Sequence, residues 1–159
     1  MRRSLMLGLA GVCALGAIST TVLAQDAPPT PEQQAQRAVD LRQGLFKVQA
    51  FSFAPTGAML KGAPFDPAVV AKGAARIVST SGMISEVFQL DTHTYQLKTK
   101  ARDSIWTNKS DFDAKANDLV TAATALETAA KSGDKGTTLK AAAAVGKACG
   151  ACHDQFRDK

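Results

Sequence analysis

The sequence Cys149-Gly150-Ala151-Cys152-His153 lies close to the C-terminus of this 159-residue chain. A Cys-x-x-Cys-His pattern is typical of the attachment site of c-type haem. Two thiols at this spacing can add to the two vinyl groups of one porphyrin, and the adjacent imidazole can bind the iron as an axial ligand. On a helix that turns by about 100° per residue, the three side chains share one face. The motif therefore predicts one covalently attached haem c, with its iron bound by His153.

Two other kinds of site share the Cys-x-x-Cys spacing. A thioredoxin-like redox pair is expected at the start of a helix in a βαβ unit, whereas this pair follows a long helical pattern. A zinc site needs a fourth ligand, and His93 is the one other histidine in the sequence. Because neither context fits, the sequence favours haem attachment.

The N-terminal segment has the pattern of a secretory signal peptide. Arg2 and Arg3 precede an apolar stretch, and Val22-Leu23-Ala24 supplies a small-residue cleavage pattern. The apolar run is shorter than the roughly 20 residues that span a bilayer. We expect residues 1–24 to be cleaved, residues 25–159 to form the mature protein, and export to place that protein in the periplasm.

The composition describes one ordinary domain of modest charge. Lys and Arg total 19 against 14 Asp and Glu, which gives a net charge of +5. No basic stripe or polybasic block marks a surface for nucleic acid or membrane, so we expect neither partner.

Four amphipathic helical segments follow the leader. Thr30-Pro31-Glu32-Gln33 has the pattern of a capping box with proline at the first helical position, which predicts a helix from about Pro31 to the low fifties. A crossover with Gly57, Gly62 and Pro64 leads to a second helix that begins at Asp66-Pro67. Residues 89–103 are irregular, a third helix opens at Ile105 and ends at Gly133, and a fourth carries the Cys-x-x-Cys-His motif. The inward positions expected on these helices are Ala38, Val39, Leu41, Leu45, Phe46, Val48 and Phe53; Val70, Ala74, Ile77, Ile84 and Phe88; Ile105, Phe112, Ala116, Leu119, Ala123, Leu126 and Ala130; and Leu139, Ala142, Gly146, Cys149, His153 and Phe156.

No segment shows the sustained alternation of a β-strand. The sequence therefore predicts an all-α fold, an antiparallel up-down-up-down four-helix bundle with the covalent haem in its core.

Three features of the chain resemble a known family, the class II cytochromes c, which include the cytochromes c′. The haem motif lies on the last helix, the first helix contains Arg42-Gln43-Gly44-Leu45-Phe46, and the third helix opens with Ile105-Trp106 followed by Phe112. This resemblance covers nearly all of the mature chain. It implies that Arg42 and Gln43 contact a haem propionate and that Phe46 stands over the distal face of the iron. It further implies that Phe88, Trp106, Phe112 and Phe156 surround the ring, and that Arg157 lies near the proximal imidazole.

The residue at the position of Phe46 divides that family. Members with methionine there are low-spin electron carriers, whereas cytochromes c′ have an apolar residue and leave the iron five-coordinate and high-spin. A phenyl ring has no lone pair, so a sixth ligand would have to come from His93, Met59 or Met83. Met83 is expected to pack in the core, and His93 to lie in a solvated loop.

An open iron in an apolar pocket suggests an electron carrier or gas-binding haem protein, not an enzyme. A phenyl ring offers no acid–base group for O–O cleavage. We expect binding of small diatomics such as NO and CO, transfer of single electrons with a redox partner protein, or both. The alternative is a low-spin six-coordinate electron-transfer cytochrome. Two apolar stripes on the first helix also favour a homodimer.

Overall fold

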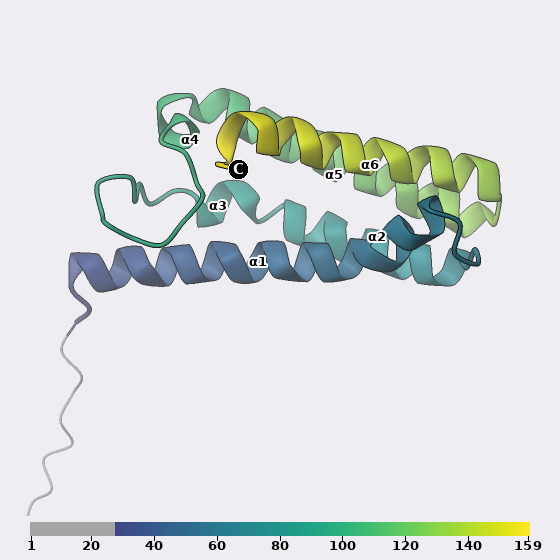
Figure 1. Ribbon diagram of the computed structural model, residues 1–159, viewed down its shortest axis with the longest axis horizontal. Coiled ribbons are helices and arrows are strands. Elements are labelled where there is room, and N and C mark those ends of the chain that lie inside the picture. The colour runs from purple at the N-terminus through teal and green to yellow at the C-terminus, as the bar shows by residue number, and fades with distance from the viewer. Residues whose placement is uncertain (1–27) are drawn as a thin grey trace, which may run out of the picture.

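The computed structural model describes residues 28–159, so the expected signal peptide lies outside the described residues. Over this range the helices are α1 (Pro31–Leu60), α2 (Pro67–Ser81), α3 (Ile84–Val87), α4 (Ser104–Thr107), α5 (Lys109–Ser132) and α6 (Lys135–Phe156). The four long helices α1, α2, α5 and α6 run alternately up and down the molecule (Figure 1). α1 packs on α2, α2 on α5, α5 on α6, and α6 closes the ring against α1. The predicted four-helix bundle is confirmed.

The helix ends follow the capping signals of the sequence. Thr30 and Gln33 form the expected capping box at the start of α1. Asp66 accepts hydrogen bonds from the backbone at the start of α2, and Asp134 does the same for α6. Gly133 ends α5 in the left-handed conformation with φ of 77°. Local sequence therefore determines where three of the four long helices begin and where α5 ends.

The first helix is longer than the sequence predicts. α1 continues through Pro55 and Gly57 to Leu60, and Gly62 makes the turn with φ of 102°. Proline removes one helical hydrogen bond and normally kinks or breaks a helix. Here the last turns of α1 bury Thr56 and Met59, and this packing outweighs the local preference.

The second and third expected helices are each interrupted once. The apolar stripe of α2 continues into Ile84 and Phe88, but the helix ends at Ser81 and restarts as the short α3. The third helix is divided at Asn108 into α4 and α5. Residues 88–103 form the irregular connection that the sequence predicts. The described residues contain no strand, and an isolated bridge joins Ala101 to Arg157.

The core consists of apolar residues from all four long helices, but some expected inward positions are exposed. Leu41 and Val48 are 58% and 47% exposed on α1, Met83 is 48% exposed, and Gly146 is exposed on α6. The inward face of α1 is instead formed by Ala35 and Val39, together with the partly buried Leu45, Phe46 and Phe53. The helix carries two apolar stripes, and only one of them can face the bundle.

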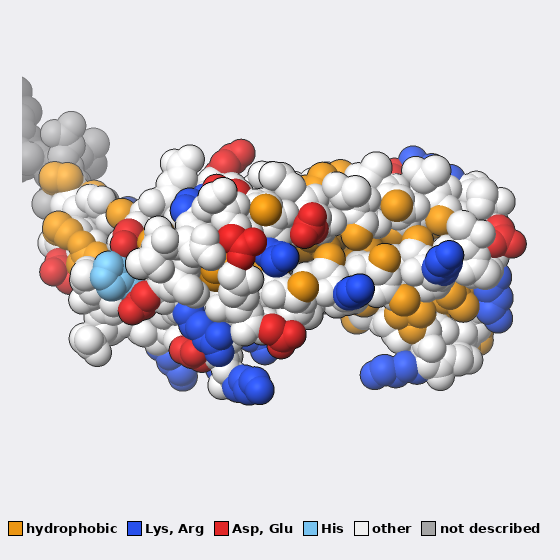
Figure 2. All heavy atoms as spheres, turned by 90° about the horizontal axis from the view of Figure 1, so that it is seen from above, with side chains coloured by type: hydrophobic (Ala, Val, Ile, Leu, Met, Phe, Trp, Pro, Cys, Tyr) orange, Lys and Arg blue, Asp and Glu red, His pale blue; other side chains and the backbone are white. Residues whose placement is uncertain are grey.

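The upper face of the bundle mixes charge with apolar surface. Figure 2 shows Lys, Arg, Asp and Glu side chains interspersed on this face, with apolar side chains between them. In the described part of the chain, no helix has the length and apolar character that a membrane crossing requires.

Candidate haem site

A cavity of about 700 Å³ opens at the end of the bundle where α6 finishes. Its volume falls in the range of about 300–1,000 Å³ that is typical of cofactor sites. The residues that line it come from all four long helices, from the short helices α3 and α4, and from the segment between these two. They include Val39, Arg42, Gln43, Phe46, Lys47, Phe53, Ile77, Ile84, Phe88, Lys100, Ala101, Ile105, Phe112, Lys115, Leu119, Val145, Cys149, Cys152, His153, Phe156 and Arg157.

The motif forms one wall of this cavity. Cys149 and Cys152 are half-buried on α6, and the side chain of His153 lines the same wall while remaining exposed to solvent. Burial raises the pKa of the Cys149 thiol, and burial together with Cys149 raises the pKa of Cys152 to about 11. Burial and the nearby Arg157 lower the pKa of His153, which favours the neutral imidazole that binds iron. The helix thus presents all three groups to one space, as the spacing predicts.

Aromatic rings form the apolar lining of the cavity. The ring of Phe88 lies 6.1 Å from that of Phe46 and 4.9 Å from that of Phe112 between centroids. Phe112 in turn meets Phe156 edge-on at 5.3 Å. Phe46 projects into the cavity from α1, and α6 with its histidine forms another wall. These four aromatic residues therefore line the same cavity as the motif.

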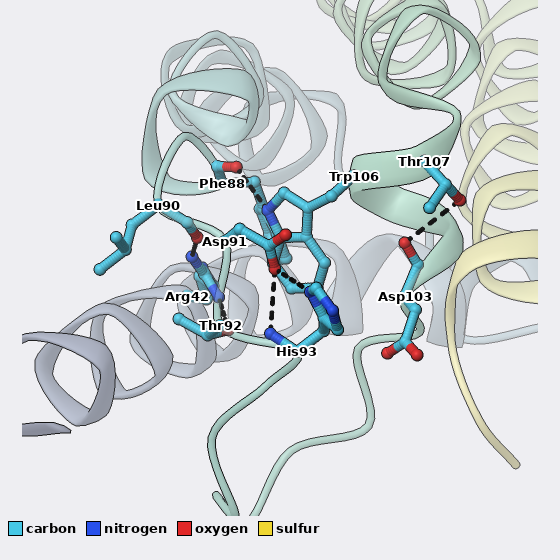
Figure 3. Close-up of polar contacts among 9 residues, drawn as sticks. All are labelled: Arg42, Phe88, Leu90, Asp91, Thr92, His93, Asp103, Trp106 and Thr107. Atoms are coloured by element: carbon cyan, nitrogen blue, oxygen red, sulfur yellow. Dashed lines mark hydrogen bonds and ion pairs between the residues drawn. The ribbon is translucent and has the colours of Figure 1, made fainter. Parts of the chain in front are cut away.

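Arg42 is held by a dense set of contacts at the edge of the cavity (Figure 3). Its Nε donates to the carbonyl of Val87 at 2.7 Å, Nη1 donates to the hydroxyl of Thr92 at 2.7 Å, and Nη2 donates to the carbonyl of Leu90 at 2.5 Å. The guanidinium also stacks on the ring of Phe88, with its carbon 4.5 Å from the centroid. Arg42 therefore fixes the segment after α3, a role that the sequence pattern does not predict.

The charge of Arg42 is buried without a matching carboxylate. The residue is 3% exposed, and none of the ion pairs found among the described residues includes it. Burial lowers its pKa from the usual value, and the charge of Asp91 partly opposes that shift. A buried guanidinium beside an apolar cavity, with two of its five N–H groups left over, fits an anionic group of the cofactor.

The other two expected polar contacts also line the cavity. Gln43 donates from Nε2 to the carbonyl of Lys98 at 2.9 Å. Arg157 follows the last residue of α6 and forms the bridge to Ala101. Lys47, Lys100 and Lys115 line the same cavity and were not expected there. Their positions depend on how α1, α5 and the irregular segment meet, which no local pattern encodes.

Trp106 lies next to the cavity wall, where it contacts Phe88. It is not among the residues that line the cavity, and Ile105 occupies that wall instead. The indole Nε1 donates to the carbonyl of Phe88 at 3.1 Å, and the ring packs against Arg42 and His93 (Figure 3).

None of the three alternative iron ligands lines the cavity. Met59 is buried near the far end of α1, and Met83 is exposed before α3. His93 is exposed in the irregular segment, and its Nδ1 lies 2.7 Å from Oδ1 of Asp91. The described residues also contain no group of three or more His, Cys, Asp or Glu side chains suited to a metal ion, such as zinc.

Two thiols and an imidazole on one helix face, beside an apolar cavity in a four-helix bundle, define a covalent haem protein of the bundle class. A family model described as cytochrome c′ matches residues 37–157 of this chain. The chain belongs to the cytochrome c′ family and carries covalently bound haem c.

Known proteins of this family are similar to the chain over most of its length. It is 37% identical to the cytochrome c′ of Cereibacter sphaeroides over 79% of this chain and 85% of that protein. The structure of cytochrome c prime from Shewanella frigidimarina has a TM-score of 0.72 with 36% identity, covering 79% of this chain and 97% of the other. A nitric oxide complex of a cytochrome c prime variant from Alcaligenes xylosoxidans has a TM-score of 0.69 with 28% identity, covering 79% and 97%.

Proposed function

We propose that this protein binds small neutral diatomics such as NO and CO at a five-coordinate haem iron and that it also passes single electrons. The observation that supports this most is the lining of the cavity. His153 is the one histidine among the described lining residues, and methionine is absent from them. When bound, the haem would be held by Cys149, Cys152 and His153 and would supply an iron able to bind a diatomic beside the apolar residues around Phe46. The solved nitric oxide complex of a related protein supports the same ligand class.

Each residue of the site has a defined role in this proposal. Cys149 and Cys152 form the two thioethers, and His153 is the axial ligand. Phe46 restricts the distal space and excludes water from it, while Phe88, Phe112 and Phe156 pack against the ring. Arg42 and Gln43 contact propionate oxygens, and Arg157 stays near the proximal imidazole. Trp106 acts outside the cavity by holding Phe88.

The cellular setting of the proposal is the periplasm, reached through a signal peptide at residues 1–24 that is removed on export. A redox partner protein would supply the electron that reduces the iron before NO or CO binds.

A homodimer also belongs to this proposal. Leu41, Val48 and Phe51 are exposed on α1, and Phe51 is 70% exposed. These side chains recur at intervals of seven and three residues, so they form one stripe on the outer face of the helix. Burial of such a stripe against a second copy would remove apolar surface from water.

A gas titration tests the proposed function. The purified ferrous protein is titrated with CO and, separately, with NO while its absorption spectrum is recorded. The proposal predicts saturable spectral change at one site per chain with both gases, and His153→Ala should alter the starting spectrum. Absence of a spectral change with both gases would contradict the proposal and favour a closed, six-coordinate iron.

A further inference from the structure

All four carbonyls in the last turn of α6 have hydrogen-bond donors, and three of these carbonyls are met by the segment before α4. The last four carbonyls of a helix lack partners inside the helix. In α6 the carbonyl of His153 accepts from the backbone N–H of Arg157 at 3.1 Å, and that of Phe156 accepts from the backbone N–H of Arg102 at 3.1 Å. The carbonyls of Asp154 and Gln155 accept from Nη1 of Arg102 at 3.0 and 3.2 Å.

Further contacts hold Arg102 itself in place. Its Nε donates to Oδ1 of Asp158 at 2.8 Å, and Asp158 donates its backbone N–H to the carbonyl of Lys100 at 2.9 Å. The hydroxyl of Ser104 donates to the carbonyl of Gln155 at 3.3 Å. A guanidinium can serve several acceptors at once because its donors lie in a fixed plane. Its positive charge also suits the negative end of the helix dipole. We call residues 100–104 the α6 clamp.

The α6 clamp and the haem cavity share residues. Lys100 and Ala101 of the clamp line the cavity, and Ala101 pairs with Arg157, which lines it as well. Asp154, whose carbonyl is the first that Arg102 holds, directly follows His153. Any shift of the clamp therefore changes the direction of the last turn of α6 and the position of Arg157 beside the imidazole.

We propose that Arg102 is a positioning residue for the proximal side of the haem. Arg102 holds the carbonyls of the three residues that follow His153. It thereby sets the orientation of the imidazole and how easily the bond between histidine and iron breaks. This inference rests on the proposed role of His153 as axial ligand. The two cysteines attach the porphyrin to α6 but do not fix the orientation of the imidazole. The clamp therefore determines that orientation.

Resonance Raman spectroscopy of the ferrous protein tests this role, because the frequency of the iron–histidine stretching band depends on the strength of that bond and on how the imidazole is held. The variants are Arg102→Gln and Arg102→Lys, and Arg76→Gln on α2 is the control with the same loss of charge. The inference predicts a lowered and broadened band for Arg102→Gln, a smaller effect for Arg102→Lys, and an unchanged band for the control. Histidine release on NO binding should be about tenfold faster in Arg102→Gln, the effect of losing a hydrogen bond to a charged group.

The outcomes separate this inference from the proposed function. A parent protein whose iron–histidine band disappears in His153→Ala supports the axial role of His153. If the Arg102 variants then lose thermal stability but keep the parent band and release rate, Arg102 is only a structural cap and the inference is wrong. If the parent protein has no iron–histidine band, the proposed five-coordinate iron bound by His153 is contradicted, and the inference about Arg102 falls with it.

Discussion

Phe46 is the residue on which the gas-binding proposal depends most. Its ring is half-buried, projects into the cavity from α1, and lies 6.1 Å from the ring of Phe88. A diatomic that enters the distal space has to displace this ring, and repacking a crowded site costs about 1–3 kcal/mol. That free energy corresponds to a roughly ten- to hundredfold loss of affinity.

Phe46→Ala should therefore bind CO to the ferrous haem about tenfold or more tightly than the parent, as measured by spectroscopic titration. Phe53→Ala is the matched control, since Phe53 lines the same cavity from the same helix and lies about two turns further on. Equal affinities of parent and Phe46→Ala would show that the ring does not stand over the iron. Phe46→Met should move the spectrum toward a low-spin, six-coordinate form if the sulfur reaches the iron.

Arg42 carries the largest buried polar network of the site. Arg42→Gln removes a charge and three hydrogen bonds, two of them to carbonyls that then lack a donor. We expect the free energy of unfolding to fall by about 2–6 kcal/mol, because each of the two carbonyls left without a donor costs about 1–3 kcal/mol. Urea unfolding of the haem-bound protein measures it. A loss below about 1 kcal/mol would show that solvent replaces these contacts.

His93 gives a dependence on pH whose sign follows from its partner. The hydrogen bond to Asp91 raises the pKa of His93 above its ordinary value of 6.5. Because the pKa is raised by folding, the contact contributes its full stabilisation at pH values below the pKa of His93 in the unfolded chain. This contribution is lost as the pH rises through the pKa of His93 in the folded protein. NMR titration of the ring should show the raised pKa, and Asp91→Asn should lower it. An equal pKa in both proteins would contradict the contact.

At the scale of the helix, close approach between α1 and α2 depends on one glycine. A Cβ atom at Gly73 would lie 2.5 Å from the backbone carbonyl oxygen of Ser52 on α1. Because backbone cannot move aside cheaply, the two helices would have to separate. Gly73→Ala should therefore lower the free energy of unfolding by about 1–3 kcal/mol.

Gly146→Ala is the matched control for this helix contact. Gly146 is exposed on α6, and a Cβ atom there meets nothing within 4 Å. Alanine should raise stability by up to about 1 kcal/mol because it favours the helix. Urea unfolding of both variants decides the point, and a neutral Gly73→Ala would show that the helices adjust without cost.

The helices also show what the sequence can predict and where it stops. Capping residues such as Thr30, Asp66 and Gly133 act within a few residues, so helix starts and the end of α5 follow from local chemistry. Helix continuation through Pro55 depends on burial of Thr56 and Met59 by distant residues. The break at Ser81 does coincide with a local signal, the C-cap Gly82, but the apolar stripe continues past it and hides the break.

The same division applies to the site. The fixed spacing of the motif was enough to place Cys149, Cys152 and His153 on one face, and the apolar periodicity was enough to place Phe46 and Phe112 on inward faces of their helices, whereas their place at the haem came from the family resemblance. The contacts of Arg42 and Arg102 join segments about fifty residues apart in the chain. Side-chain hydrogen bonds of that kind leave no periodic pattern, so the sequence could not predict either network.

At the scale of the whole molecule, the outer stripe of α1 predicts association. Sedimentation equilibrium at micromolar concentration should give the mass of a dimer, and Phe51→Glu should give the monomer, because a charge at the 70% exposed Phe51 would have to be desolvated in the interface. Val69→Glu is a control with a similar change on α2, at a position that is 39% exposed. A monomeric parent would overturn the dimer.

The covalent link between protein and haem is a second property of the whole molecule. The purified protein should keep its haem through acid–acetone extraction and on a denaturing gel, because thioether bonds survive both treatments. Cys149→Ala should weaken retention, whereas His153→Ala should disturb iron ligation and leave the thioethers possible. Release of the porphyrin from the parent under these conditions would rule out attachment at the motif.

The absorption spectrum of the ferric and ferrous protein tests the central claim most directly, since it reports the ligands on both sides of the iron. An axial His153 opposite an apolar wall predicts five-coordinate, high-spin spectra in both redox states, without the charge-transfer band of a methionine–iron bond. Low-spin spectra in both states would contradict the account, because a sixth ligand would then have to reach the iron from outside the cavity lining that the structure shows.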